Sequence, residues 1–207
     1  MIALISDKAL SFISAGGTQI ELNLSGSRIA FKVPKNFSKD YPPPKTLSKS
    51  FNIYDPDIYE DELSALYLYD MFWDYQSGLI FKSIDGTLSM NVSLFRTTEN
   101  NIDTNNLEQL ISIIPRDFEA IYGNKDSEDY EISGPDELSV RKIHSLNWAS
   151  YHYSINGDLT TAYALPISER HYLRVFFRLI DSHRSPTFKE QATADIQQIM
   201  ASFVKGQ

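Results

Sequence analysis

The chain has 207 residues, of which 42% are hydrophobic and 13% aromatic, and its formal net charge is −8. This composition supports a packed core and one domain, 1–207, and it excludes global disorder. The negative charge disfavours nucleic acid as a partner and favours a basic protein. The absence of cysteine excludes disulfides, thiolate nucleophiles and thiolate metal sites.

The N-terminal residues do not read as a signal peptide, because they lack an early positive charge and Asp7 and Lys8 interrupt the apolar run. No apolar run approaches the roughly 20 residues that a membrane-spanning helix needs. We therefore expect no membrane association and a cytoplasmic location, with the periplasm as the alternative. Nothing in the sequence indicates an oligomeric state.

Alternating polar and apolar residues predict an N-terminal hairpin with strands at 18–24 and 28–34 and a turn at Gly26. Pro42, Pro43 and Pro44 predict an extended linker. Apolar residues at near-helical spacing predict a short helix over 63–73. We interpret 35–77 as a proline-rich and acidic-aromatic insertion.

A second hairpin is predicted from 78–82 and 87–96, with its turn at Asp85-Gly86. A helix is predicted over 105–122, with Asn105 as its N-cap and with a kink or break at Pro115.

Residues 124–137 are mostly polar and predict a loop. Four strands should follow, of which the last is the most apolar and should be central: 139–145, 148–155, 159–166 and 171–179. A closing helix is predicted over 186–204, with Ser185 as cap and Pro186 at its first position.

This order predicts an α+β fold, an antiparallel β-sheet flanked by helices. The segments "IELNLSGSRIAFKVPKNF", "NWASYHYSINGDLTTAYALPISERHYLRVFFRLIDS" and "FKEQATADIQQIMASF" resemble the PsbP-like family. The resemblance implies an α/β/α sandwich. Small bacterial members of this kind are often adaptors, chaperones or immunity proteins, so it implies binding rather than catalysis and supplies no catalytic residues.

Catalytic and metal-binding signatures are weak. The spacing of Asp55 and Asp57 is similar to that of the first ligands of a calcium-binding loop. However, Pro56 stiffens the start of the segment, and Ile58 and Tyr59 stand where oxygen donors are needed. We interpret the four histidines as surface or rim residues. Neither a nucleophile motif nor a phosphate-binding loop occurs. We therefore predict that the protein is not an enzyme, with no cofactor, metal or catalytic residue.

The segment 51–75 carries seven carboxylates and eight aromatics without a single Lys or Arg. Tyr and Trp contribute strongly to interfaces, and carboxylates speed encounter with basic partners. The alternative is a helix whose Leu66, Tyr67 and Trp73 pack on the sheet. The predicted partner-binding residues are Tyr59, Glu60, Asp61, Glu62, Tyr69, Asp70, Trp73 and Asp74.

Two classes of function remain open. The favoured hypothesis is an immunity protein that neutralises a cognate secreted bacterial toxin, a basic protein, through this acidic-aromatic surface. An adaptor or chaperone of a secretion system would use the same surface. The alternative class is a small-ligand or metal-binding enzyme.

Overall fold

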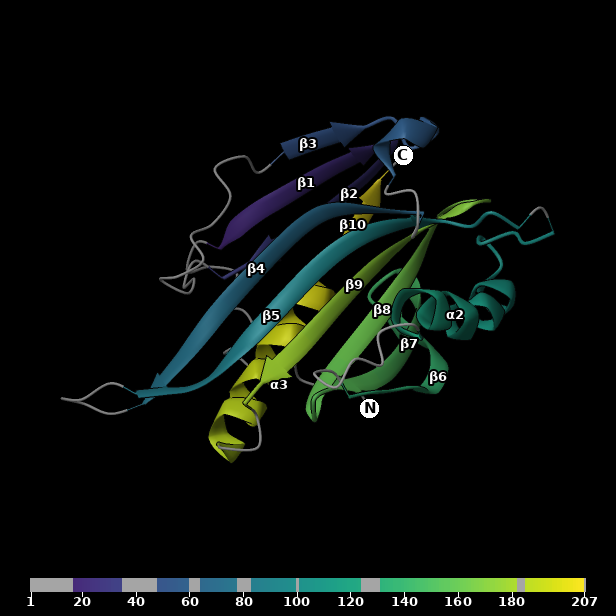
Figure 1. Cartoon of the computed structure of the whole chain (residues 1–207). Helices are drawn as coiled ribbons and strands as arrows, with labels where there is room; N and C mark the ends of the chain where they lie inside the picture. The colour runs from purple at the N-terminus through teal and green to yellow at the C-terminus, as the bar shows by residue number, and fades with distance from the viewer. Residues whose placement is uncertain are drawn as a thin grey trace, which may run out of the picture.

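The computed structural model describes residues 17–34, 48–59, 64–77, 83–99, 101–123, 131–181 and 185–206. These residues form two β-sheets, two α-helices and one short 3-10 turn (Figure 1). The fold is therefore α+β, as the sequence predicts, but with two sheets. Within the described part of the chain, no helix is long and apolar enough to cross a membrane.

The smaller sheet has four strands in the order β10-β2-β1-β3. Its strands are β1 (Thr18–Leu24), β2 (Ser27–Val33), β3 (Ser48–Phe51) and β10 (Val204–Gly206). The predicted N-terminal hairpin is confirmed: β1 and β2 pair antiparallel, and Ser25 and Gly26 take positive φ values in the turn. β3 adds parallel to β1. Pro42, Pro43 and Pro44 lie outside the described residues.

The larger sheet has six antiparallel strands in the order β4-β5-β9-β8-β7-β6. Its strands are β4 (Ala65–Ser77), β5 (Ser83–Arg96), β6 (Ile132–Ile143), β7 (Leu146–Ile155), β8 (Asp158–Ser168) and β9 (His171–Ile180). β9 is an interior strand with neighbours on both sides, which confirms the prediction from its apolar composition.

The predicted helix over 63–73 is wrong in its described part, because Ala65–Ser77 is strand β4. The pairing with β5 shifts register between Tyr67 and Tyr69, so Leu68 is an extra residue in β4. A bulge of this kind breaks the period-two alternation. The apolar residues around it therefore mimic helical spacing.

Two further boundaries differ from the sequence prediction. Asp85 and Gly86 lie inside β5 instead of forming a turn, and the connection 78–82 lies outside the described residues. β6 begins at Ile132, so the second half of the predicted loop is an edge strand. Register shifts on either side of Asp136 make β6 irregular, which hides it from a search for alternation.

Both long helices begin with a side-chain cap. α2 (Leu107–Tyr122) is capped by Asn106, one residue after the predicted cap, and it continues through Pro115 without a break. α3 (Pro186–Ala201) is capped by Ser185, whose Oγ accepts the Phe188 N–H at 3.2 Å. It ends three residues before the predicted Val204, because the chain turns there into β10.

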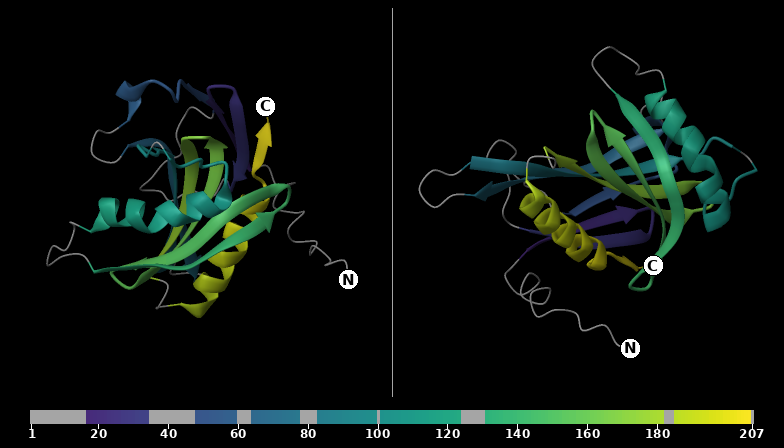
Figure 2. Two further views of the ribbon diagram at one scale, coloured as in Figure 1. Left: turned by 90° about the vertical axis from the view of Figure 1, so that its right-hand side faces the viewer. Right: turned by 90° about the horizontal axis from the view of Figure 1, so that it is seen from below.

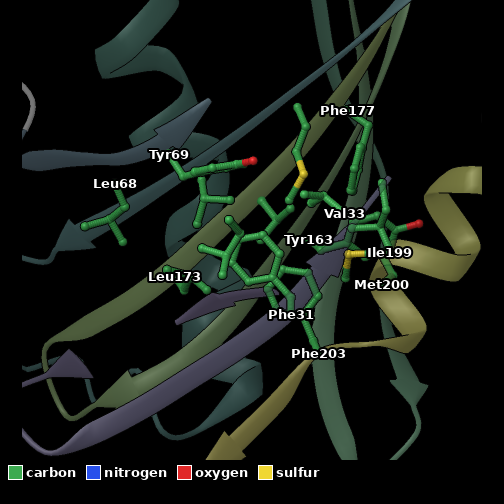
Figure 3. Packing of buried hydrophobic residues seen from close by; sticks show 14 of the residues in the cluster. Phe31, Val33, Leu68, Tyr69, Tyr163, Leu173, Phe177, Ile199, Met200 and Phe203 are labelled. Atoms are coloured by element: carbon green, nitrogen blue, oxygen red, sulfur yellow. The ribbon is translucent and has the colours of Figure 1, made fainter. Parts of the chain in front are cut away.

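The larger sheet is covered on both faces (Figure 2). Its inner face packs on the four-stranded sheet and α3 in one core, and α2 covers part of its outer face in a second core. Figure 3 shows the inner core, where Phe31, Tyr69, Leu173, Phe177 and Phe203 meet. The six-stranded sheet is thus the middle layer of the molecule.

Gly86 marks the closest approach of α3 to the sheet. A Cβ at this position would collide with the ring of Phe188, which is 1% exposed. We expect Gly86→Ala to lower the free energy of unfolding by about 1–3 kcal/mol, because the buried ring has no space into which it can move. Urea unfolding followed by circular dichroism measures this loss.

The matched control is Gly206→Ala, whose Cβ would meet only the Arg28 Cβ at 3.8 Å. It should leave the urea midpoint close to that of the natural chain. Equal midpoints for the two variants would show that Phe188 does not need the space above Gly86.

Candidate functional site: the outer face of β4 and β5

The structure divides the predicted partner-binding residues into three groups. Glu60, Asp61 and Glu62 lie outside the described residues. The predicted aromatic anchors are buried, so their assignment to a binding surface is wrong: Tyr59, Tyr69 and Trp73 are 6%, 5% and 3% exposed. The remaining acidic residues point outward, with Asp70 exposed and Asp74 partly exposed.

The register of β4 on β5 explains this division. Tyr69, Met71 and Trp73 pair with Val92, Met90 and Leu88, which are buried in the inner core. The residues between them therefore point to the outer face, because successive side chains of a strand alternate. Tyr67, on the other side of the bulge at Leu68, points outward as well and pairs with Ser93.

Tyr69 and Trp73 join the two sheets. The Tyr69 ring meets Phe31 of β2 edge-on, with centroids 5.7 Å apart, and burial raises the pKa of its hydroxyl. Trp73 donates its indole N–H to the Pro34 carbonyl at 3.4 Å. These aromatics stabilise the inner core.

Tyr59 closes the turn that contains η1 (Pro56–Ile58). Its hydroxyl donates to the Ile53 carbonyl at 2.7 Å, and burial raises its pKa to about 12. Its ring stacks on His171, with centroids 6.1 Å apart. His171 is 3% exposed, so its assignment as a surface or rim histidine is wrong. The burial of its ring lowers its pKa.

The calcium-like motif has another role. An Asp55 carboxylate oxygen accepts the Asp57 N–H at 3.0 Å and so caps η1. In the described ranges, no three metal-binding side chains lie together. Asp55 therefore acts as a turn-forming residue in this structure.

The outward side chains of β4 and β5 form a surface that we call the β4–β5 outer face. Its members are Tyr67, Asp70, Phe72, Asp74 and Asn91, and the buried Ser89 lies beneath them. Figure 1 shows β4 and β5 with α3 behind them and with α2 displaced toward the other end of the sheet, where it packs on β6 and β7. None of the described elements covers this part of the sheet, and Tyr67 is 54% exposed.

The β4–β5 outer face combines acidic, aromatic and small polar groups. Asp74 accepts the Thr87 hydroxyl at 2.8 Å, which fixes its carboxylate at one end of the surface. At the other end, a hollow of about 410 Å³ lies beside the bulge, and its lining includes Tyr67, Asp70 and Asn91 together with Lys49 of β3. The surface therefore offers both fixed negative charge and a recess for a partner side chain.

β4 is an edge strand, but its edge is poorly suited to pairing with another strand. The register shifts near Leu68 and at Gln76 interrupt the regular ladder. Lys49 of β3 donates its Nζ to the Leu68 carbonyl at 2.9 Å and occupies that acceptor. Bulges and lysines are common protections of sheet edges. The geometry therefore favours contacts through the face over addition of a strand.

A buried arginine lies where α2 begins to cover the sheet. Arg174 of β9 is 5% exposed, and its guanidinium carbon lies 4.4 Å from the Phe95 ring centroid and 5.5 Å from that of Phe176. Within the described residues, no carboxylate comes within salt-bridge distance of it, and its Nε has no hydrogen-bond partner. The two rings offset part of the cost of burying this cation.

Asp117 fastens α2 beside this arginine. Tyr172 donates its hydroxyl to the Asp117 carboxylate at 2.6 Å. Burial raises the pKa of Asp117, although the Tyr172 hydrogen bond and the charges of Arg116 and Arg174 oppose that shift. This contact ties α2, which packs on β6 and β7, to β9, and the β4–β5 outer face is left open.

The sequence prediction missed Tyr67 and Phe72 as surface aromatics. The missed signal was the alternation Asp70, Phe72, Asp74, which repeats every second residue and is typical of a strand face. The helix alternative placed Tyr67 on the side that packs on the sheet, whereas Tyr67 is exposed.

No protein-family model and no curated protein matches the chain. Among solved structures, the chain is similar to LpqN, which is described as involved in cell envelope biogenesis of Mycobacterium tuberculosis. The alignment covers 95% of each chain at 11% sequence identity, with a TM-score of 0.39. At that score the similarity carries no argument about fold or function.

The contact between Tyr172 and Asp117 gives a stability prediction. We expect Tyr172→Phe to lower the free energy of unfolding by about 1–3 kcal/mol near pH 7, because it leaves a buried carboxylate without its donor. The hydrogen bond favours the ionised carboxyl, so its contribution is present above the raised pKa of Asp117 in the folded chain and is lost as the pH falls through that value. The loss should therefore shrink toward about pH 4.

Urea unfolding at the two pH values measures this change. Tyr67→Phe, which removes a hydroxyl from an exposed ring, is the matched control and should have little effect at either pH. If Tyr172→Phe had the same free energy of unfolding as the natural chain at neutral pH, the role of Asp117 in fastening α2 would be contradicted.

Proposed function

We propose that the chain is a protein-binding module whose β4–β5 outer face receives a basic protein. The observation that carries this proposal is the side-by-side placement of Tyr67, Asp70, Phe72 and Asp74 on a sheet face that no described element covers. The narrower proposal is an immunity protein that neutralises a secreted bacterial toxin. An adaptor of a secretion system would be a module of the same kind.

Charge supports a basic partner. The chain carries a formal net charge of −8, and two of the carboxylates, Asp70 and Asp74, flank the outward ring of Phe72. Opposite charges at the rim of an interface raise the association rate, and aromatic rings supply buried contact area. Toxins that act on nucleic acid are commonly basic, because they bind phosphate. An acidic, aromatic face can occupy such a phosphate-binding surface.

The resemblance to the PsbP-like family agrees with this proposal. Its α/β/α sandwich is the finer fold that we propose for the chain, with α3 and α2 on opposite faces of the six-stranded sheet. A cytoplasmic protein without catalytic activity fits both the immunity and the adaptor proposal.

The test is the effect of a single charge reversal on a captured partner. The natural chain and Asp70→Lys are used to capture proteins from the source cell, and each retained protein is then purified and titrated against both. We expect the natural chain to retain one basic protein stoichiometrically. Asp70→Lys should weaken that complex by about tenfold or more at low salt, because it replaces an attraction by a repulsion.

Glu21→Lys is the matched control, because Glu21 is an exposed carboxylate of β1 on the other sheet. It makes the same change of net charge and should leave the affinity unchanged. The immunity proposal also requires that the retained protein is harmful to cells when it is expressed alone. Co-expression of this chain should prevent that harm. If Asp70→Lys bound the same protein with equal affinity, the β4–β5 outer face would not be the binding surface.

A further inference from the structure

A groove of about 560 Å³ lies between α3 and the inner face of the six-stranded sheet. It is on the opposite side of the sheet from the β4–β5 outer face, so it is independent of the proposed function. Strands β6, β7, β8 and β9 and one side of α3 supply its lining. Its volume lies within the range of about 300–1,000 Å³ that is typical of small-molecule sites.

One wall of the groove is cationic. Arg141 of β6 and His152 of β7 present their side chains to it, whereas the Lys142 side chain alternates to the outer face of the sheet. None of its described lining residues is Asp or Glu. The Glu137 carboxylate lies 4.0 Å from His152 Nε2, and its side chain is 77% exposed. The Arg141 guanidinium supplies this wall with positive charge in a chain whose net charge is −8.

The rest of the lining is apolar, with a few hydroxyls. Leu159, Leu179, Ile196 and Met200 supply apolar surface. Figure 3 shows Tyr163 and Met200 close to each other where α3 meets the sheet.

The imidazole in the cationic wall is held in place. The His152 Nδ1 and the Thr161 hydroxyl form a hydrogen bond of 3.0 Å, which orients the ring. This bond joins β7 to β8 within the groove lining.

We propose that this groove binds an amphiphilic monoanion, a carboxylate joined to an unbranched hydrocarbon tail. The carboxylate meets the guanidinium of Arg141 beside the imidazole of His152, and the tail lies along the leucines and Met200 under α3. Charge-assisted hydrogen bonds to the head fix its orientation, and the buried tail supplies area. A neutral molecule of the same length would leave the cationic wall without a partner.

Isothermal titration with three probes tests the proposal on the full chain. The first probe, octanoate, carries both the carboxylate head and the hydrocarbon tail. The second, octan-1-ol, has the same tail with a neutral head, and the third, acetate, has the carboxylate with almost no tail. Octanoate should bind at one site, octan-1-ol at least tenfold more weakly and acetate without measurable heat. Equal binding of octanoate and octan-1-ol, or no octanoate binding, would overturn the proposal.

Two variants locate the site. Arg141→Gln should weaken octanoate about tenfold and leave octan-1-ol unchanged, because it removes one charged donor from an exposed position. Thr193→Trp, at an exposed position of α3 in the groove lining, should block both probes. The controls are Arg28→Gln and Thr187→Trp, which change exposed residues of β2 and α3 outside the groove lining.

Circular dichroism establishes that each variant is folded before titration. Octanoate binding that persists in both Arg141→Gln and Thr193→Trp would show that the probe binds elsewhere and would overturn the assignment. Loss of octanoate binding in the two control variants would show a general surface effect and would overturn it equally.

Discussion

The pairing of β4 with β5 is the constraint on which the rest of the molecule depends. One extra residue, Leu68, shifts the register of β4, so that Tyr67 faces outward on one side of it and Tyr69 faces inward on the other. Because side chains alternate along a strand, a register different by one residue would move every aromatic of β4 to the opposite face. The bulge therefore determines which residues build the core and which form the β4–β5 outer face.

The inward residues of β4 connect the two sheets, and the outward residues form the β4–β5 outer face. Phe31 of β2 illustrates the connection, because its ring contacts Tyr69 on one side and stacks on Phe203 on another, with centroids 4.4 Å apart. The same alternation leaves Asp70 and Phe72 on a sheet face beside β5. One strand thus serves both stability and the proposed binding function.

Much of the fold could be predicted from the sequence. Strict alternation located the N-terminal hairpin, and the strands predicted over 148–155 and 159–166 correspond to β7 and β8. The caps at Ser185 and near Asn106 located the starts of both helices. These signals are local, so they do not depend on the tertiary structure.

The errors occurred where tertiary contacts override local patterns. The bulge in β4 and the irregular β6 break alternation, and Gly86, a residue typical of turns, is used for the close approach of α3. The predicted anchors Tyr59 and Trp73 were wrong for a related reason, because aromatic residues suit both cores and interfaces. Only the strand register distinguishes a core position from an interface position for an aromatic residue. The charged residues Asp70 and Asp74 were easier to place, since isolated charges avoid the core.

The central claim is that β4 presents Tyr67, Asp70, Phe72 and Asp74 outward and Tyr69, Met71 and Trp73 inward. Because the chain contains no cysteine, single cysteines introduced at each position from 67 to 74 can be labelled with a thiol reagent under native conditions. The account predicts fast labelling at 67, 70, 72 and 74 and slow labelling at 68, 69, 71 and 73. A pattern that repeats every three to four residues, or fast labelling at 69 and 73, would contradict it.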